Sequence, residues 1–166
     1  MYQNIINELD KAMSKTISLI ESANEISINQ IPFKGSWTAA QTARHLVKAG
    51  ADMPALFAAQ APTANRQPDE KAGELKGILL DFDKKMESPE FIIPEDKNYT
   101  KKELINDTEK IRKETMEVLT TARLDEIPTL QEGNPLKDYT KLELLHFAVY
   151  HTQRHNRQIK NILEKV

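Results

Sequence analysis

The sequence predicts an all-α fold, a four-helix bundle formed by a single domain over residues 1–166. Four long segments place apolar residues three and four positions apart, the period of a helix that buries one face. Three of these segments begin with a Thr followed three residues later by Glu or Gln, which is the signature of a helix N-terminus. A long, proline-containing stretch separates the second segment from the third.

The first and third helices each carry one apolar stripe for burial. The first helix is expected over about residues 3–24 and the third over about residues 101–123. Thr100 and Glu103 form the capping signature of the third helix, whereas the first helix has no such signature. The stripes consist of Ile5, Leu9, Ala12, Met13, Ile17, Ile20 and Ala23 in the first helix and of Leu104, Ile111, Val118, Leu119 and Ala122 in the third.

The second and fourth helices also begin at capping signatures. The second begins at Thr38, with Gln41 as the reciprocal partner, and is expected to run to about residue 60. It should bend near Pro54, because proline lacks an N–H and its ring clashes with the carbonyl four residues earlier. The fourth begins after Thr140, with Glu143 as the partner, and runs nearly to the end of the sequence.

A long connection, residues 61–99, links the second helix to the third. Its middle, about residues 69–86, has apolar side chains at helical spacing and predicts a short extra helix. A connection of this length can carry the chain from one end of a bundle to the other. The second and third helices can therefore run parallel, in an up-down-down-up order with a long crossover between them.

The composition is that of a globular protein and excludes several classes of function. The 23 Lys and Arg nearly balance the 25 Asp and Glu, so no field of one sign indicates nucleic acid or an anionic membrane as partner. No segment has the apolar length of a transmembrane helix or the pattern of a signal peptide, so a cytoplasmic location is expected. The absence of Cys excludes disulfides and sulfur ligands, which leaves His, Asp and Glu as metal ligands.

Three of the four histidines fall on helix faces that should be buried. His151 and His155 lie four residues apart on the fourth helix, so they share one face with Cβ atoms about 5 to 6 Å apart. His45 lies on a face of small residues in the second helix. At about 1.5 Å per residue, His45 lies about 10 Å from the start of its helix and His155 about 13 Å from the end of its own. Antiparallel packing of these two helices therefore brings the histidines to one level.

Spacing and facing alone leave two interpretations of these histidines open. Each buried imidazole has two polar nitrogens that cost free energy if unpaired, and a shared metal ion satisfies one nitrogen on each ring. Alternatively, each is a core histidine hydrogen-bonded to a neighbouring group. His146 differs from the other three, because it lies about 140° around the helix from His151 and is interpreted as a solvated side chain.

Two segments of the sequence resemble a known family. SWTAAQTARHLVKAG places Trp37 just before the second helix and His45 eight residues later. TKLELLHFAVYHTQRHNRQIKNI contains His151 and His155 in an H-x3-H pattern. Together with the order of helices, these segments resemble the DinB/YfiT-like superfamily over essentially the whole chain. The resemblance implies a four-helix bundle of unusual connectivity in which His45, His151 and His155 hold a divalent metal ion, most often zinc or nickel.

The resemblance and the donor set together predict an enzyme. Several members of the superfamily are transferases or hydrolases that work with low-molecular-weight thiols. Three neutral imidazoles leave the double charge of an ion uncompensated and at least one coordination position open, which acidifies a bound water or thiol and polarises a substrate oxygen. The predicted function is a metal-dependent transferase or hydrolase for a small molecule, with water or a thiol cosubstrate as the nucleophile.

Other functions and other site residues stay open at the level of the sequence. One alternative is a non-catalytic binding or stress-response module in which the ion ties the second helix to the fourth, and another is a structural bundle that forms a homodimer through apolar faces. Asp52, two turns beyond His45, is a candidate general base or hydrogen-bond acceptor behind a metal ligand. Arg44, Arg154 and Arg157 are candidates for holding an anionic substrate.

Overall fold

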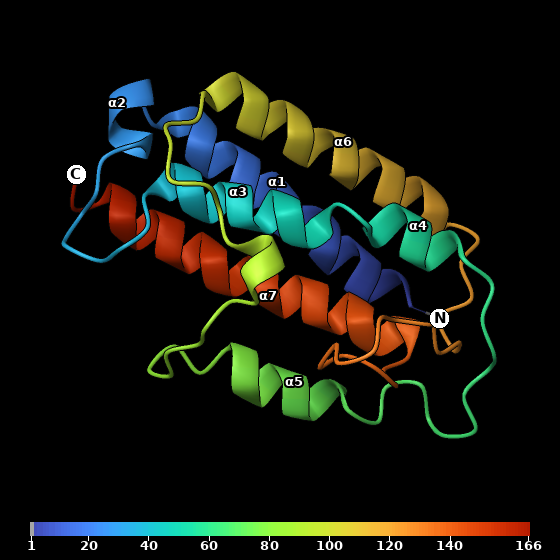
Figure 1. Ribbon diagram of the computed structural model, residues 1–166. Helices are drawn as coiled ribbons and strands as arrows, with labels where there is room; N and C mark the ends of the chain where they lie inside the picture. Colours follow the sequence, from blue (N-terminus) through green and yellow to red (C-terminus); the bar gives the residue numbers. More distant parts are fainter. Residues whose placement is uncertain (1) are drawn as a thin grey trace.

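A computed structural model describes residues 2–166 and confirms the predicted all-α bundle (Figure 1). The long segments of the bundle are α1 (Gln3–Ser22), α3 (Ala39–Gly50) continued by α4 (Met53–Ala58), α6 (Lys101–Leu119) and α7 (Lys141–Leu163). The shorter elements are α2 (Glu25–Ile28), α5 (Ala72–Leu79) and the 3₁₀ turn η1 (Glu90–Ile92). Within residues 2–166 the only β-type pairing is an isolated bridge between Thr63 and Glu126.

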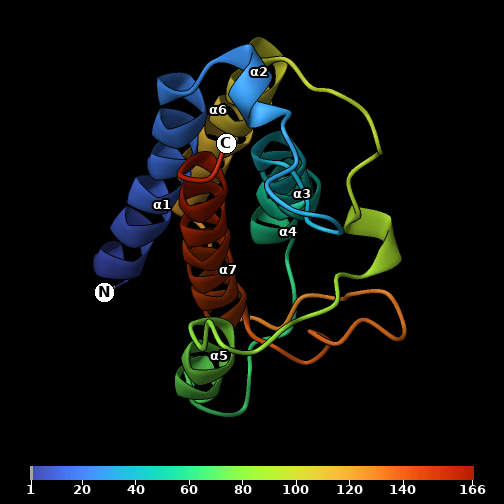
Figure 2. The same cartoon turned by 90° about the vertical axis from the view of Figure 1, so that its left-hand side faces the viewer.

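The order of the helices is the predicted up-down-down-up order. In Figure 1, α1 and α7 run in one direction along the bundle, and α3 and α6 run in the opposite direction. α1 packs mainly against α6 and α7, and α3 packs against the same two helices, so α1 and α3 lie diagonally across the bundle. The long crossover leads from α4 through α5 and η1 to α6, and α5 packs on α7 outside the bundle (Figure 2).

The three predicted capping signatures are confirmed and set where the helices start. In each, the Thr hydroxyl accepts from the backbone N–H three residues later, and the side chain of that later residue accepts from the Thr N–H. The reciprocal pairs are Thr38 with Gln41, Thr100 with Glu103, and Thr140 with Glu143. Because these caps fix the starts of α3 and α7, they also fix the rotation of the two histidine-bearing helices.

Two of the predicted helix ends are too late. α1 ends at Ser22 instead of Asn24, because Asn24 is extended and its side chain accepts from the N–H of Ser27, which starts α2. α2 had no prediction from the sequence. α6 ends at Leu119 instead of Arg123, and the hydroxyl of Thr120 donates to the carbonyl of Glu117 in the last turn.

The expected bend in the second helix is a break, and the extra helix is shorter than predicted. α3 ends at Gly50 and α4 starts at Met53, so Pro54 stands at the second helical position, where a missing N–H costs nothing. α5 ends at Leu79 instead of near Met86. The guanidinium of Arg154 donates to the carbonyls of Leu79 and Asp81 and so caps this helix end.

The core consists of two apolar clusters with a polar layer between them. One cluster includes Leu9, Val47, Phe57, Leu145 and Val149. The other includes Ile20, Ala43, Tyr99, Leu104 and Ile159. Between the clusters, each of the four main helices contributes a buried polar residue: Thr16 from α1, His45 from α3, Thr108 from α6, and His155 with Asn156 from α7. None of the helices in residues 2–166 combines the length and apolar character needed to cross a membrane.

Candidate metal centre

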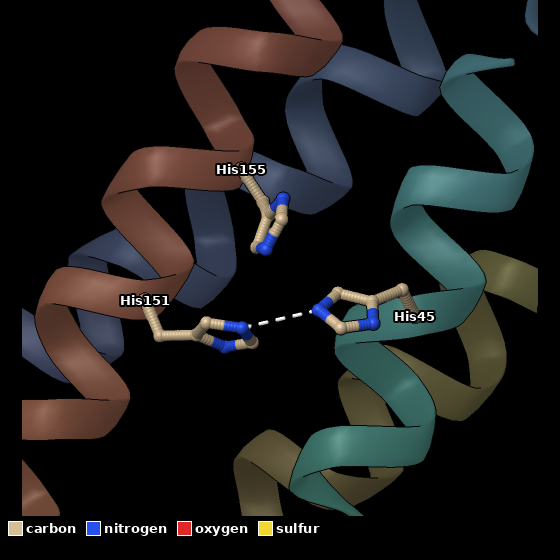
Figure 3. A group of neighbouring side chains, drawn as sticks. All are labelled: His45, His151 and His155. Atoms are coloured by element: carbon tan, nitrogen blue, oxygen red, sulfur yellow. Dashed lines mark hydrogen bonds between the residues drawn. The ribbon is translucent and has the colours of Figure 1, made fainter. Parts of the chain in front are cut away.

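The structure brings His45, His151 and His155 together between α3 and α7 (Figure 3). His45 lies in the second turn of α3 and is 1% exposed, His155 is buried, and His151 is half-buried. Ring centroids are separated by 5.0 Å for His45 and His151, 4.5 Å for His45 and His155, and 4.6 Å for His151 and His155. One nitrogen from each ring lies within 4.8 Å of the other two, and Nε2 of His45 is 3.1 Å from Nε2 of His151.

This donor set fits a divalent metal ion. Tetrahedral zinc with Zn–N distances of about 2.0 to 2.1 Å places neighbouring ligand nitrogens about 3.3 Å apart. The 3.1 Å between the Nε2 atoms of His45 and His151 is close to that spacing, and no separation in the group exceeds 4.8 Å. The group consists of three imidazoles, and no carboxylate of residues 2–166 belongs to it, so it offers an ion nitrogen ligands alone. The cluster therefore has the composition and approximate spacing of a three-His site.

Groups behind the rings orient two of the three imidazoles. Nδ1 of His45 lies 3.0 Å from the carbonyl oxygen of Ile92, and Nδ1 of His155 lies 2.8 Å from Oε1 of Gln158. An acceptor on Nδ1 requires the N–H to be there, which leaves the Nε2 lone pair for a metal ion. The remaining walls are aromatic, since Trp37 lies 5.1 Å from His45 and Phe147 stacks at 5.2 Å on His151.

The environment keeps all three imidazoles neutral. Burial is the main cause that lowers the pKa of His45, and the nearby Lys48 lowers it further, against the hydrogen bond to the Ile92 carbonyl. Burial and the neighbouring histidines lower the pKa of His151 well below its ordinary value. Burial, followed by the proximity of His45, lowers the pKa of His155 to about 4. Metal ligands must be deprotonated, so these shifts favour metal binding at neutral pH.

His146 lies outside the cluster, as the sequence predicted, although it is half-buried and not fully exposed. Its Nδ1 lies 3.1 Å from the hydroxyl of Tyr150, on the neighbouring turn of α7. Asp52 is exposed at the start of α4, with no side-chain cap hydrogen bond. The acceptors behind the histidines are the Ile92 carbonyl and Gln158, so other groups fill the acceptor role that the sequence suggested for Asp52.

The three arginines considered as substrate ligands have protein partners. Arg44 pairs with Asp107 at 3.1 Å, and Arg154 donates to carbonyls after α5, including that of Lys84. The guanidinium of Arg157 lies 4.4 Å from the centroid of the Phe82 ring. Through these contacts each arginine packs against another segment of the chain or joins two segments.

The sequence did not reveal the two acceptors that orient the rings. For Gln158 a signal was present, because it lies three residues after His155 and side chains at that spacing are neighbours on a helix. The Ile92 carbonyl is a backbone group that lies 47 residues from His45, at the end of the 3₁₀ turn η1, and no pattern in the sequence marks it.

An up-down-down-up helical bundle with two buried histidines and one half-buried histidine at its centre defines a class of helical proteins suited to hold one divalent ion. The sequence profile described as the DinB superfamily matches residues 8–159. Because this range covers well over half of the sequence, the chain belongs to the DinB superfamily, as its two histidine segments suggested. Comparisons with curated proteins and with solved structures gave no significant match.

Proposed function

We propose that this chain is a metal-dependent enzyme that transfers or hydrolyses a group on a small molecule. His45, His151 and His155 hold one divalent ion, zinc or nickel, and the nucleophile is water or a low-molecular-weight thiol. The observation that carries the proposal is the convergence of three imidazoles in the core of the bundle, a group to which no carboxylate of residues 2–166 belongs.

The neutrality of the ligands supports a catalytic site over a structural one. Because the pKa of each of the three histidines is lowered, their lone pairs are available at neutral pH. Three neutral ligands do not offset the charge of a divalent ion, which when bound acidifies a water or thiol and polarises a substrate oxygen. Structural zinc sites are closed by four protein ligands, whereas sites with three protein ligands leave a position for substrate.

The burial of the ligands indicates the side from which a substrate approaches. His45 and His155 are buried, whereas His151 is half-buried, so the open position lies toward the side of His151. Phe147 stacks on His151 and Trp37 lies beside His45, which places apolar surface next to the reacting atoms and strengthens electrostatic interactions there. We assign no general base, because Asp52 is exposed and the acceptors behind the rings are other groups.

Elemental analysis of protein purified without a metal-chelating resin tests the site. We expect one ion per chain in the parent and in His146→Ala. The ion should be lost from His151→Ala and from His155→Ala, because each substitution removes one of three ligands. Full metal occupancy in His155→Ala would contradict the assignment of the ligands.

Activity of the metal-loaded protein tests the chemistry. Thiol cosubstrates paired with small electrophiles, and a series of esters and amides, cover the two reaction types. Full occupancy without turnover of any of these would favour the non-catalytic module, in which the ion ties α3 to α7. A parent that binds no ion would favour the structural bundle, and analytical ultracentrifugation would then show whether it forms the homodimer.

A further inference from the structure

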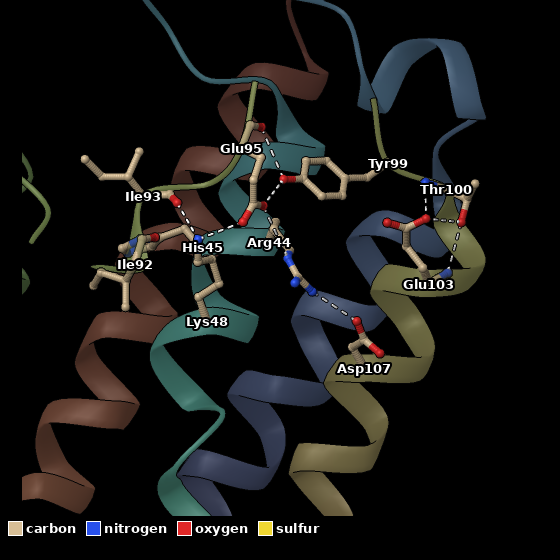
Figure 4. A network of polar contacts seen from close by, with 10 residues as sticks. All are labelled: Arg44, His45, Lys48, Ile92, Ile93, Glu95, Tyr99, Thr100, Glu103 and Asp107. Carbon is tan, nitrogen blue, oxygen red and sulfur yellow. Dashed lines mark hydrogen bonds and ion pairs between the residues drawn. The ribbon is translucent and has the colours of Figure 1, made fainter. Parts of the chain in front are cut away.

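Residues 89–99, here called the strap, lie against α3 and present two consecutive carbonyl groups to it (Figure 4). The carbonyl of Ile92 accepts from Nδ1 of His45 at 3.0 Å, and the carbonyl of Ile93 accepts from Nζ of Lys48 at 2.7 Å. His45 and Lys48 lie three residues apart and are therefore neighbours on one face of α3. The strap is thus bonded to α3 at two points, the proposed metal ligand His45 and its neighbour Lys48.

The bond from the strap selects one tautomer of His45. A carbonyl oxygen can only accept, so Nδ1 of a neutral imidazole must be protonated for this bond to form. Nε2 then carries the lone pair, and it is this atom that lies 3.1 Å from Nε2 of His151. Gln158 orients His155 less strictly, because an amide side chain can turn and offer its NH₂ group instead of its oxygen.

Side chains at the far end of the strap hold it in place. The carboxylate of Glu95 accepts from the hydroxyl of Tyr99 at 2.6 Å and from Nζ of Lys48 at 2.9 Å. Tyr99 is 2% exposed, and its backbone N–H and carbonyl are both bonded to the side chain of Asn29. Lys48 therefore bonds the strap twice, at the Ile93 carbonyl and at Glu95.

We propose that the strap orients His45 toward the metal ion, and that Lys48 and Tyr99 are positioning residues that hold the strap against α3. The proposal rests on the three-His metal site proposed above. Neither residue touches the ion, and both act through the Ile92 carbonyl.

The charge of Lys48 makes the proposal sharply testable. Lys48 is a cation close enough to His45 to lower its pKa, so it also repels a bound divalent ion. If charge alone mattered, Lys48→Met would strengthen metal binding. Loss of orientation predicts the opposite result, a weakening of about 10-fold, which is typical of removing a group that supports a metal ligand.

The experiment combines zinc affinity with the tautomer of His45. Zinc titration of metal-free parent, Lys48→Met and Tyr99→Phe gives the affinities, and nitrogen-15 NMR of the imidazoles without metal gives the tautomer. We expect the parent to hold His45 with its proton on Nδ1, Lys48→Met to show mixed tautomers and weaker zinc binding, and Tyr99→Phe to show a smaller loss. Lys160→Met, at an exposed lysine of α7 paired with Glu164, is the matched control and should change neither quantity.

Each departure from this pattern has a definite meaning. Unchanged or tighter zinc binding in Lys48→Met overturns the proposal, and so does weaker binding with an unchanged tautomer, since the strap would then not act through His45. If the parent itself binds no zinc, the metal site fails, and the tautomer in Lys48→Met still decides whether the strap orients the ring. Circular dichroism of each variant verifies that the bundle is folded.

Discussion

Two buried polar clusters lie along α7, and they differ in how their polar atoms are satisfied. At the start of the helix, Nζ of Lys141 donates to the carboxylate of Glu126 at 2.7 Å and to the carbonyl of Phe57 at 3.2 Å. The carboxylate of Glu143 accepts two bonds of 2.6 Å from the guanidinium of Arg66. Every charge in this first cluster has partners within the protein.

The second cluster, farther along α7, has imidazoles in place of paired charges on its inner side. The nitrogens of His45, His151 and His155 that face inward meet chiefly one another. The neighbouring polar residues of the same layer are satisfied, since Thr16 donates to Asn156 and Asn156 donates to the Ala12 carbonyl. A buried polar cluster whose charges are all paired contributes to structure, whereas imidazoles that meet chiefly one another, through the bond between His45 and His151, still have lone pairs that a ligand can use.

The largest expected effect comes from breaking the first cluster. Glu143→Ala removes a carboxylate that is 0% exposed and with it the acceptor of the N–H groups of Lys71 and Thr140. The Arg66 guanidinium loses its charged partner and keeps only backbone carbonyls as acceptors. Burial alone would raise the pKa of Glu143, but the bonds from Arg66 and from these N–H groups lower it overall. Urea unfolding should show a loss of about 3 kcal/mol, because two N–H groups lose their acceptor and a half-buried guanidinium loses its charged partner.

Glu164→Ala is the control for this prediction. Glu164 pairs with Lys160 on the exposed side of α7, and its removal should cost less than about 0.5 kcal/mol. A loss below about 1 kcal/mol in Glu143→Ala would mean that the first cluster does not contribute to stability in the way its geometry indicates.

The second cluster should make the metal-free protein sensitive to acid. Burial, with the neighbouring His45, lowers the pKa of His155 to about 4 from an ordinary value of 6.5. Between these values the unfolded chain binds a proton that the folded chain does not, so stability falls as the pH drops from 6.5 toward 4. The full effect of such a shift is on the order of 3 kcal/mol for one group. Arg154 lowers the pKa of His155 further, against the hydrogen bond to Gln158, which raises it. Lys48 lowers the pKa of the neighbouring His45.

Urea unfolding at pH 5 and pH 7 in the presence of a chelator measures this dependence. The carboxylates titrate in the parent and in His155→Ala alike, so the difference between the two proteins isolates the histidine. We expect the parent to lose more stability between pH 7 and pH 5 than His155→Ala does. Equal losses would show that His155 is not held neutral by its surroundings.

Zinc should stabilise the second cluster and leave the first unaffected. A ligand that binds only the folded state stabilises it by about 2.7 kcal/mol at a free concentration 100 times its dissociation constant. We expect this gain in urea unfolding of the parent and of Glu143→Ala, and no gain in His155→Ala. A zinc-dependent gain in His155→Ala would place the ion elsewhere in the protein.

The fold was largely predictable from the sequence because local signals determine it. The capping boxes at Thr38, Thr100 and Thr140 are short-range hydrogen-bond patterns, and each marked a helix start correctly. The helix ends were less predictable. Thr120 closes α6 within its last turn, whereas the end of α5 depends on Arg154, which approaches from α7.

The candidate site was predictable in part for the same reason. His151 and His155 share a face by helical spacing, and the antiparallel order that brings them to His45 is confirmed. Their binding of a metal ion stays a prediction. The strap and its Ile92 carbonyl were not predictable, because a segment with a single short 3₁₀ turn has no sustained period and a backbone acceptor leaves no mark in the sequence.

The smallest expected effect concerns the fourth histidine, His146. It lies on α7 but outside the second cluster, so it tests whether a histidine of this helix matters for the site only when it belongs to that cluster. His146 is half-buried, and its Nδ1 lies 3.1 Å from the Tyr150 hydroxyl. His146→Ala should therefore cost about 1 kcal/mol in urea unfolding, the net value of one neutral hydrogen bond, and should leave the zinc-dependent gain at its parental size. Both quantities come from unfolding curves recorded with and without zinc. A reduced zinc gain in His146→Ala would mean that the metal site extends around the helix to the Tyr150 side, and that three ligands facing α3 are not the whole set.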